Sequence, residues 1–362
     1  MRFRREPDNG FWPALRAAVD AKVRGPGRSP FAPPSLWAKA VFYLAIVGAG
    51  YAALIVGQSF AGTLAAYAVF NLAALLLVLN LAHDAAHDAL TPNRTFNQVV
   101  TEAVFGLTGI DGHLWRMRHA RSHHVFPNIN GCDTDIDHNP FLRLSPNHPW
   151  RPRHRWQHLY AAFVYMSVHL HAIMVQDTIY ILQKSLANLR DIRHTPQRYA
   201  GFVAMKLAYV GVVLGIPIAC SPLPWLHVLG AYALATVVTS LFFVIVLIGT
   251  HFAQGNAFPQ PDAEGRIGSS FVEHVFASSL DWSPTSRLAI FVTGGLNAHA
   301  AHHLFPKVSH AHYRTISRTI ERLAQAHGVD YHHTGLGGMI AAHFRHLAEM
   351  GRPPLSQVSV PS

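Results

Sequence analysis

The sequence is poor in charge. Only 13% of its 362 residues are Asp, Glu, Lys or Arg, and half are hydrophobic, whereas about a quarter of an average soluble domain is charged. Acidic residues are scarcer than basic ones, 19 against 29, but there is no lysine-rich run or basic helix of the kind that binds nucleic acid. The composition therefore indicates an integral membrane protein with basic cytoplasmic loops, and it argues against a nucleic-acid partner.

Cysteine is also rare. Cys132 and Cys220 are the only two, too few for a disulfide framework or a thiolate metal site. The basic N-terminus has no apolar stretch directly behind its charges, so we expect no secretory signal peptide. Residues 1–36 are rich in Pro and Gly toward their end and are predicted to form a loose or surface-lying cytoplasmic leader.

Four long apolar runs stand out among what is present. Each is long enough to cross roughly 30 Å of hydrocarbon as a helix, and they lie at about 38–58, 63–81, 199–219 and 226–247. The link within each pair carries no Lys or Arg, whereas the leader and residues 94–155 carry many, which predicts cytoplasmic termini. We therefore predict an all-α protein with four transmembrane helices in two hairpins, capped by a cytoplasmic helical domain.

This topology divides the chain into five regions. They are a leader at 1–36, a first hairpin at 37–82, a cytoplasmic region at 83–198, a second hairpin at 199–251 and a second cytoplasmic region at 252–362. Residues 156–182 are apolar but interrupted by histidines, Gln176 and Asp177. A crossing here would put the histidine clusters described next on opposite sides of the membrane, so we predict an amphipathic helix in the cytoplasm or the interface. Lys206, inside the third run, has no assigned role.

Histidine is abundant, with 26 residues, and eight of these fall into three short boxes. Box 1 is HDAAHD with His83 and His87, box 2 is RHARSHH with His119, His123 and His124, and box 3 is NAHAAHHLFP with His299, His302 and His303. On a helix, residues at i, i+3 and i+4 share one face, so box 3 is predicted to aim its imidazoles at one point. His251 ends the fourth apolar run at the same predicted surface and is a ninth candidate.

The number of histidines predicts two metal ions. A mononuclear zinc site uses four ligands, and eight or nine imidazoles on one membrane face exceed that. Imidazole suits iron, zinc, copper and nickel, so ligand type alone leaves the metal open. We predict that Asp84, Asp88 and Asn297 support the ligands from behind, and Asn297 has helix capping or a metal-bound water as further roles.

A run of acidic residues follows box 2. Asp133, Asp135 and Asp137 are predicted to anchor a loop or to hydrogen-bond close to the metals.

The three boxes in register, with LNAHAAHHLFP around box 3 and HNPFLRLSPNHPWRPRHRWQHLYA after box 2, resemble the membrane fatty acid desaturases. The likeness extends over about residues 79–313 and is strongest to the front-end, linoleoyl-CoA-desaturase-like branch. It implies that the eight box histidines and His251 bind two iron ions, cycling between Fe2+ and Fe3+. It also implies removal of two hydrogens from adjacent carbons of an acyl chain, while O2 is reduced to water with two external electrons.

The resemblance also implies partners and a location. The substrate is a fatty acyl chain carried by coenzyme A, acyl carrier protein or a lipid, and the setting is a bacterial inner membrane. Front-end members commonly carry Gln where this chain has His299, and many eukaryotic members carry a fused cytochrome b5 domain with an HPGG motif, which this sequence lacks. Electrons are therefore expected from a separate ferredoxin or cytochrome b5 type carrier.

Two other functions are compatible with a histidine-rich membrane protein. Hydroxylation, ketolation or acetylenation at the same di-iron site begins with the same hydrogen abstraction, and the sequence does not separate these outcomes from desaturation. A metal transporter or sensor would place ionisable residues inside the spans, whereas here the boxes lie outside the predicted ones.

Overall fold

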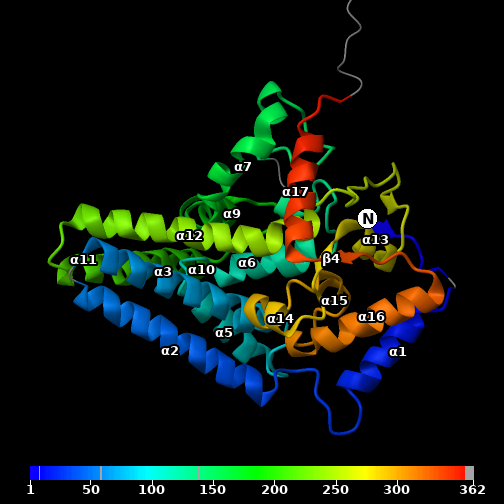
Figure 1. The fold of residues 1–362 in the computed structure, drawn as a ribbon, viewed down its shortest axis with the longest axis horizontal. Helices are drawn as coiled ribbons and strands as arrows, with labels where there is room; N and C mark the ends of the chain where they lie inside the picture. The colour runs from blue at the N-terminus through cyan, green and yellow to red at the C-terminus, as the bar shows by residue number, and fades with distance from the viewer. Residues whose placement is uncertain (8, 58, 137–138, 355–362) are drawn as a thin grey trace, which may run out of the picture.

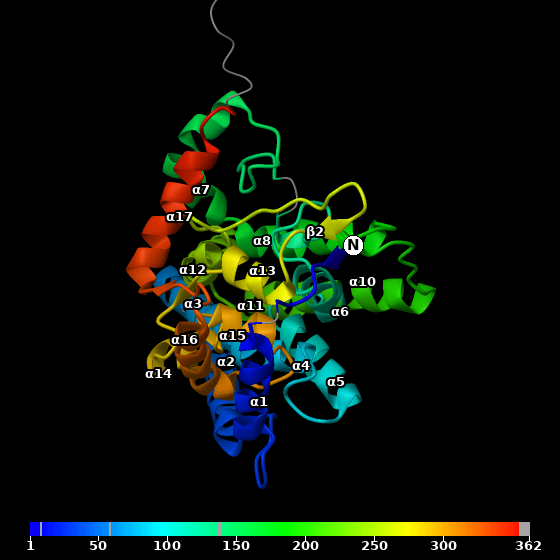
Figure 2. The ribbon, with the colours of Figure 1, turned by 90° about the vertical axis from the view of Figure 1, so that its right-hand side faces the viewer.

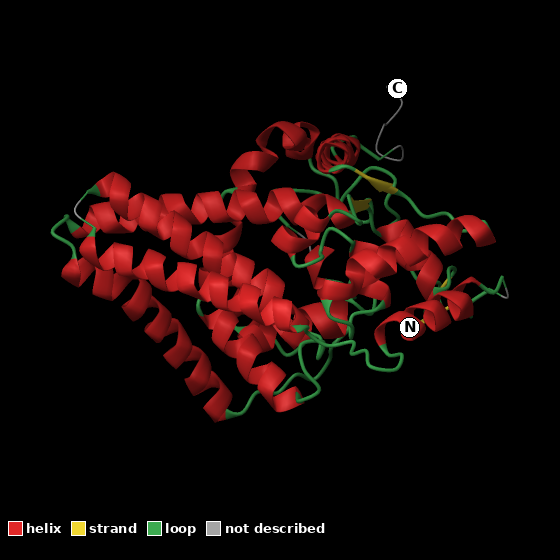
Figure 3. Cartoon of the chain, turned by 60° about the horizontal axis from the view of Figure 1, so that its bottom comes forward, coloured by secondary structure: helices red, strands yellow, loops and turns green. Residues whose placement is uncertain are grey.

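The computed structural model describes residues 1–362 apart from 8, 58, 137–138 and 355–362. Helices make up almost all of the regular structure in this described part (Figure 3). The strands are two residues each and pair in parallel, β1 (Arg2–Phe3) with β2 (Arg266–Ile267) and β3 (Asp281–Trp282) with β4 (His333–Thr334). The predicted all-α fold is confirmed.

In the described part of the chain, four helices are long and apolar enough to cross a membrane, and a bent pair at residues 152–182 would be a fifth if it formed one span. The first is α2 (Pro34–Val56) and the fourth is α12 (Trp225–His251). The second is continuous through α3 (Phe60–Leu77), η1 (Val78–Ala82) and α4 (His83–Ala86). The third is continuous through α10 (Pro196–Val210), η6 (Gly211–Gly215) and α11 (Ile216–Cys220). All four lie together at one end of the molecule, with α3 packed against both α2 and α12 (Figure 1). The second of these helices runs through His83 to Ala86 and the fourth ends at His251, so these two histidines are part of the long helices themselves.

The remaining helices gather around the ends of the long helices that carry the histidines (Figure 1). Before the third long helix they include α5 (Arg94–Gly106), α6 (Gly112–Arg118), η2 (His119–His123) and η3 (Thr134–Ile136). After the fourth they are α13 (Phe271–Ser278), α14 (Arg287–Thr293), α15 (His299–Leu304), η7 (His310–His312), α16 (Tyr313–His327) and α17 (Leu336–Met350).

The segment predicted as one amphipathic helix is bent. Its first part is η4 (Pro152–Trp156) and α7 (Gln157–Tyr165), and its second part is α8 (Val168–His171), η5 (Ala172–Gln176) and α9 (Asp177–Leu182). The two parts meet at 72°, so the prediction of a single helix is wrong in this respect. Its placement outside the membrane stays a prediction.

Lys206 ties this bent segment to the third long helix. Its ammonium group donates hydrogen bonds to the carbonyls of Gly109 at 2.7 Å and Ile173 at 2.6 Å, and it pairs with the Asp177 carboxylate at 2.8 Å. Asp177 also accepts the backbone N–H of Asp111. Lys206 is partly buried and Asp177 is buried; charged groups in such a setting need partners of this kind, and these partners join α10, α9 and the turn that leads into box 2.

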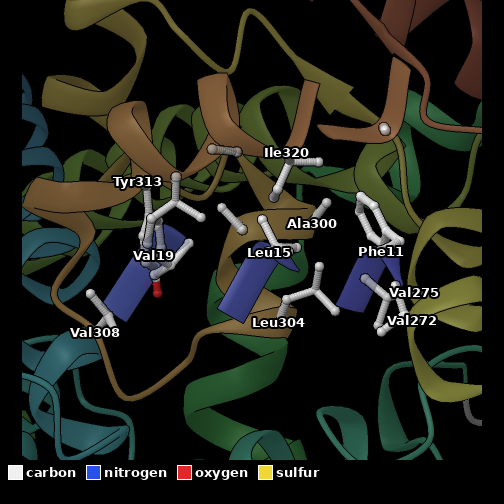
Figure 4. Packing of buried hydrophobic residues seen from close by; sticks show 14 of the residues in the cluster. Phe11, Leu15, Val19, Val272, Val275, Ala300, Leu304, Val308, Tyr313 and Ile320 are labelled. Atoms are coloured by element: carbon white, nitrogen blue, oxygen red, sulfur yellow. The ribbon is translucent and has the colours of Figure 1, made fainter. Parts of the chain in front are cut away.

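The leader contains a packed helix. Residues 11–23 form α1, which buries one apolar residue per turn: Phe11, Leu15, Val19 and Val23. This face packs against the helix of box 3 and against α16 (Figure 4), and Figure 2 shows α1 in front of these helices, at the end of the molecule that carries the histidines. The prediction of a loose or surface-lying leader is therefore wrong for α1, because its spacing of four residues makes one continuous apolar stripe.

Candidate metal centre

The structure brings histidines from all three boxes and from α12 together in two neighbouring groups. The first group is His83, His87, His119 and His302, and the second is His123, His251, His299 and His303. Within each group, one ring nitrogen from every histidine lies within 4.8 Å of the others. This is the arrangement of donors that a metal ion requires, and in the described part of the chain four histidines meet in this way twice.

His124 lies between the two groups. Its Nε2 is 3.1 Å from His119 Nε2 and 2.8 Å from His302 Nε2, both in the first group. Its ring also stacks on that of His303 in the second group, with centroids 4.3 Å apart. All nine histidines predicted as ligands therefore lie in one continuous site.

Three ring nitrogens of the second group lie very close together. His251 Nε2 lies 2.7 Å from His299 Nε2 and 3.1 Å from His303 Nε2, and the last two atoms are 3.2 Å apart. Three ring nitrogens with their lone pairs directed at one another repel unless a cation or a proton lies between them. The placement of His251 agrees with its predicted role.

Box 3 does not aim at one point, and this part of the prediction is wrong. On α15, His299 and His303 are four residues apart and share a face, so both enter the second group. His302 is turned about 100° away from His303 around the helix axis, so it enters the first group. One short helix therefore contributes to both groups.

Box 2 is divided in the same way by a turn of π-helix. Residues 119–123 form η2, and the backbone N–H of His124 donates to the carbonyl of His119, five residues earlier, at 3.0 Å. The wider turn places His119 and His124 together beside the first group and directs His123 into the second. Single turns of π-helix often occur at functional sites, and η1, just before His83, is another.

Hydrogen-bond acceptors on the far side of the rings fix which nitrogen is free. Nδ1 of His251 faces the carbonyl of Ser278 at 2.9 Å, and Nδ1 of His299 faces the carbonyl of Leu296 at 3.1 Å. A carbonyl can only accept, so both rings carry their proton on Nδ1 and present the lone pair of Nε2 to the group. This is the usual arrangement of metal-binding histidine.

Asp133 does the same for His123. Its carboxylate lies 3.0 Å from His123 Nδ1 and also accepts the backbone N–H groups of Asn128 and Asp135. Both roles predicted for this acidic run, loop anchor and hydrogen-bond partner near the metals, are thus combined in Asp133. Asp135 pairs with Arg118, and Asp137 lies outside the described residues.

The electrostatics of the site keep most of the imidazoles neutral. Burial lowers the pKa of His87 and of His299 to about 3, and neighbouring histidines contribute to the same effect. Burial and the surrounding imidazoles also hold the pKa of His119, His124 and His303 well below the ordinary value. Neutral imidazole is the form that binds metals.

His123 is the exception. Burial alone would lower its pKa, but the Asp133 and Asp135 carboxylates outweigh burial and raise it to about 9. A carboxylate behind the ring makes this imidazole a stronger donor to a cation.

The donor set fits metal ions. His87 Nε2 is buried and has no hydrogen-bond partner in the described part of the chain, which is costly for a polar atom unless something else binds it. Ring nitrogens of neutral histidines are good ligands for iron and other transition metals. The predicted metal site is therefore supported by the geometry.

The other predicted supporting residues lie close by but contact different groups. Asp84 accepts hydrogen bonds from the Ser309 hydroxyl at 2.7 Å and from the backbone N–H of His310 at 3.2 Å, and its carboxylate lies 3.0 Å from His310 Nδ1. It thus joins the helix of box 1 to the chain just after box 3. Asp88 pairs with Arg116 at 2.8 Å.

The side-chain amide of Asn297 forms hydrogen bonds with backbone carbonyls and with a neighbouring hydroxyl. Its Oδ1 accepts from the Thr293 hydroxyl, and its Nδ2 donates to the carbonyls of Trp282 and Ser283. The N-cap residue of α15 is Ala298, so the predicted capping role of Asn297 is wrong. Asn297 instead holds strand β3 beside box 3.

Two supporting groups escaped the sequence analysis. Tyr313 is buried with its hydroxyl 3.3 Å from His302 Nδ1, and the Ser278 carbonyl supports His251. Tyr313 follows box 3 closely and could have been singled out as a polar aromatic residue beside the site. A backbone carbonyl leaves no signal in a sequence.

The sequence of this chain is similar to those of known proteins. Residues 58–335 match the fatty acid desaturase family. The sn-1 linoleoyl-lipid 6-desaturase of Arthrospira platensis is 26% identical over 351 residues, covering 95% of this chain and 94% of that protein. The protein of the same name from Synechocystis is 26% identical over 348 residues, with 95% and 96% covered.

A third relative is longer than this chain. The acyl-lipid (8-3)-desaturase of Physcomitrium patens is 28% identical over 276 residues, which cover 75% of this chain but only 57% of that protein. The predicted class of enzyme, an oxidoreductase that desaturates fatty acyl chains, is confirmed by the family match and these relatives. The chain belongs to the fatty acid desaturase family.

Proposed function

We propose that this protein inserts a double bond into an acyl chain of a membrane lipid, using O2 and a centre of two iron ions. The observation that carries the proposal is the pair of four-histidine groups, with Nδ1 of His123, His251 and His299 directed at acceptors and their Nε2 atoms available to a metal. Two relatives that match over nearly their whole length are named as linoleoyl-lipid desaturases, which favours a lipid carrier over coenzyme A or acyl carrier protein.

We assign one iron to each group. His83, His87, His119 and His302, with His124, would hold the first ion, and His123, His251, His299 and His303 would hold the second. Bound iron supplies the redox chemistry with O2 that removes hydrogen from an unactivated methylene. The chain's own contribution is to hold nine neutral or carboxylate-supported imidazoles in place before the reaction.

The setting follows from charge. We expect both termini and the metal centre on the cytoplasmic side of a bacterial inner membrane, because basic residues concentrate in the leader and in residues 94–155. Electrons would come from a separate ferredoxin or cytochrome b5 type carrier. A reporter fused after Arg190 should give the same cytoplasmic signal as one fused at the C-terminus, and opposite signals would refute this topology.

The decisive experiment is lipid analysis of cells that express the chain, together with iron measurement on the purified protein. We expect a new double bond in the acyl chains of intact membrane lipids, and iron bound to the protein. His251→Ala should abolish the product. His227→Ala is the matched control, since His227 lies exposed at the opposite end of the same helix, and it should keep the wild-type product.

Three results would overturn the proposal. A hydroxylated fatty acid in place of the double bond would identify a related hydroxylase. Product found first on an acyl thioester would contradict the lipid carrier. An active His251→Ala variant with a full complement of iron would remove His251 from the centre.

A further inference from the structure

We propose that Asp281 is a positioning residue for the second histidine group, and that it acts by fixing the first turn of the helix that carries box 3. The inference rests on the proposed function, because it concerns how tightly the second metal is held. Asp281 lies between the fourth long helix and box 3, outside the three boxes.

The contacts of Asp281 are those of a helix cap supplied from another element. The residue is 1% exposed, and its Oδ1 accepts the backbone N–H of Ala300 at 2.8 Å. The N-cap residue of α15, Ala298, has no side chain that could bind this N–H. A helix of six residues is too short to be stable by itself, so the aim of its histidines depends on such outside contacts.

A second contact fixes Asp281 itself. Its Oδ2 accepts a hydrogen bond from the Tyr331 hydroxyl at 2.6 Å. Tyr331 lies just before strand β4, which pairs with β3 in the register Asp281 to His333. The C-terminal part of the chain thus holds the residue that caps box 3.

The strand that carries Asp281 also contacts the other ligand-bearing elements. Next to it, the N–H of Leu280 donates to the carbonyl of Thr250, one residue before His251, at 2.7 Å. The indole N–H of Trp282 donates to the carbonyl of Val246 in α12 at 3.0 Å. The N–H of Trp282 donates to the carbonyl of Asn297 at 3.0 Å.

The start of the same stretch reaches box 2. The carbonyl of Ser278 accepts from His251 Nδ1 and from the side chain of Asn128. The backbone N–H of Asn128 in turn donates to Asp133, the partner of His123. Residues 278–283 therefore connect the helices and loops that present His123, His251 and box 3, and Asp281 is the ionisable side chain of that stretch.

The expected effect is selective. Replacing a group that supports a metal ligand from behind typically weakens metal binding by about 10- to 100-fold. In Asp281→Ala we expect that loss for one of the two irons, since three members of the first group come from boxes 1 and 2 and the fourth, His302, has its own partner in Tyr313. Asp281→Asn should restore binding, because its amide oxygen can accept the N–H of Ala300.

The test is equilibrium competition for iron between the purified holoenzyme and a chelator, read as iron retained per chain. Asn93→Ala is the matched control. The side chain of Asn93 caps α5 by accepting the N–H of Phe96 at 3.0 Å, and α5 carries no histidine box. Asp281→Ala should release one iron at a chelator concentration about 10- to 100-fold lower than wild type requires. Asn93→Ala should release both irons as wild type does.

The outcomes separate this inference from the proposed function. A wild-type protein without two bound irons would refute the proposed function. If wild type holds two and Asp281→Ala holds both as tightly, the inference is wrong. Tyr331→Phe keeps the carboxylate of Asp281 but removes its hydroxyl partner. The inference is also wrong if Asp281→Ala loses its fold and both irons while Tyr331→Phe binds both irons as wild type does. A weaker shift of one iron in Tyr331→Phe supports it.

Discussion

Leu15 in the leader helix should be needed for the stability of the region around box 3. Its side chain is 0% exposed and lies beside Ala300 and Ile320 in one apolar cluster (Figure 4). Leu15→Ala removes three carbon atoms from a site whose small neighbour, Ala300, cannot move in to fill the space. A Leu→Ala change at such a site costs about 3 to 5 kcal/mol.

Amide hydrogen exchange followed by mass spectrometry measures this cost directly. Exchange of residues 11–23 requires α1 to open, and a loss of about 3 to 5 kcal/mol raises the open population by roughly 100- to 4,000-fold. Peptides from α15 and α16 should also exchange faster, because their apolar faces pack on α1.

Leu288→Ala is the matched control for this measurement. It makes the same chemical change at a side chain that is 72% exposed, where the expected cost is within about 0.5 kcal/mol. If Leu15→Ala left exchange of residues 11–23 within threefold of wild type, the packing argument for α1 would be refuted.

Two further perturbations test other parts of the structure. Lys206→Met should lower the free energy of unfolding by about 3 to 5 kcal/mol, because it leaves the buried Asp177 carboxylate without its cation; adding Asp177→Asn should recover part of the loss in thermal denaturation, and an additive double variant would contradict the pairing. His274 is buried, donates to the carbonyl of Pro127 at 2.7 Å, and has its pKa lowered by burial to about 4. Because the unfolded chain then binds the extra proton between about pH 6.5 and 4, stability is complete above that window and falls as pH drops through it, by about 2 kcal/mol at pH 5. His274→Gln, which keeps a donor for Pro127, should show a smaller fall of the melting temperature from pH 7 to pH 5, and equal falls in both proteins would show that His274 is not the group responsible.

Features that depend on short segments of the chain are predictable from the sequence. The four apolar runs became the four long helices, and the three boxes with His251 became one site. These features depend only on hydrophobicity and on residue spacing within a few turns. The packing of the leader helix does not follow from its sequence, because its apolar stripe lies among basic residues, prolines and glycines and its partners on α15 and α16 are distant along the chain.

The contacts of the polar residues around the site depend on tertiary packing. Asp133 supports His123, Asp84 joins box 1 to the chain after box 3, and Asn297 holds β3 instead of capping α15. Each of these residues lies near a box in the sequence. What each one contacts depends on the packing of elements that are distant along the chain.

By itself, then, the sequence determined the family, the all-α membrane architecture and the identity of nine clustered histidines, because helical period and side-chain chemistry are properties of short segments. Only the tertiary structure decided how those histidines divide between two groups. Neighbours such as His302 and His303 point about 100° apart on a helix, and which group each one joins depends on the elements packed on either side. The same packing decided that residues as distant as Asp281 and Tyr331 hold box 3 in place.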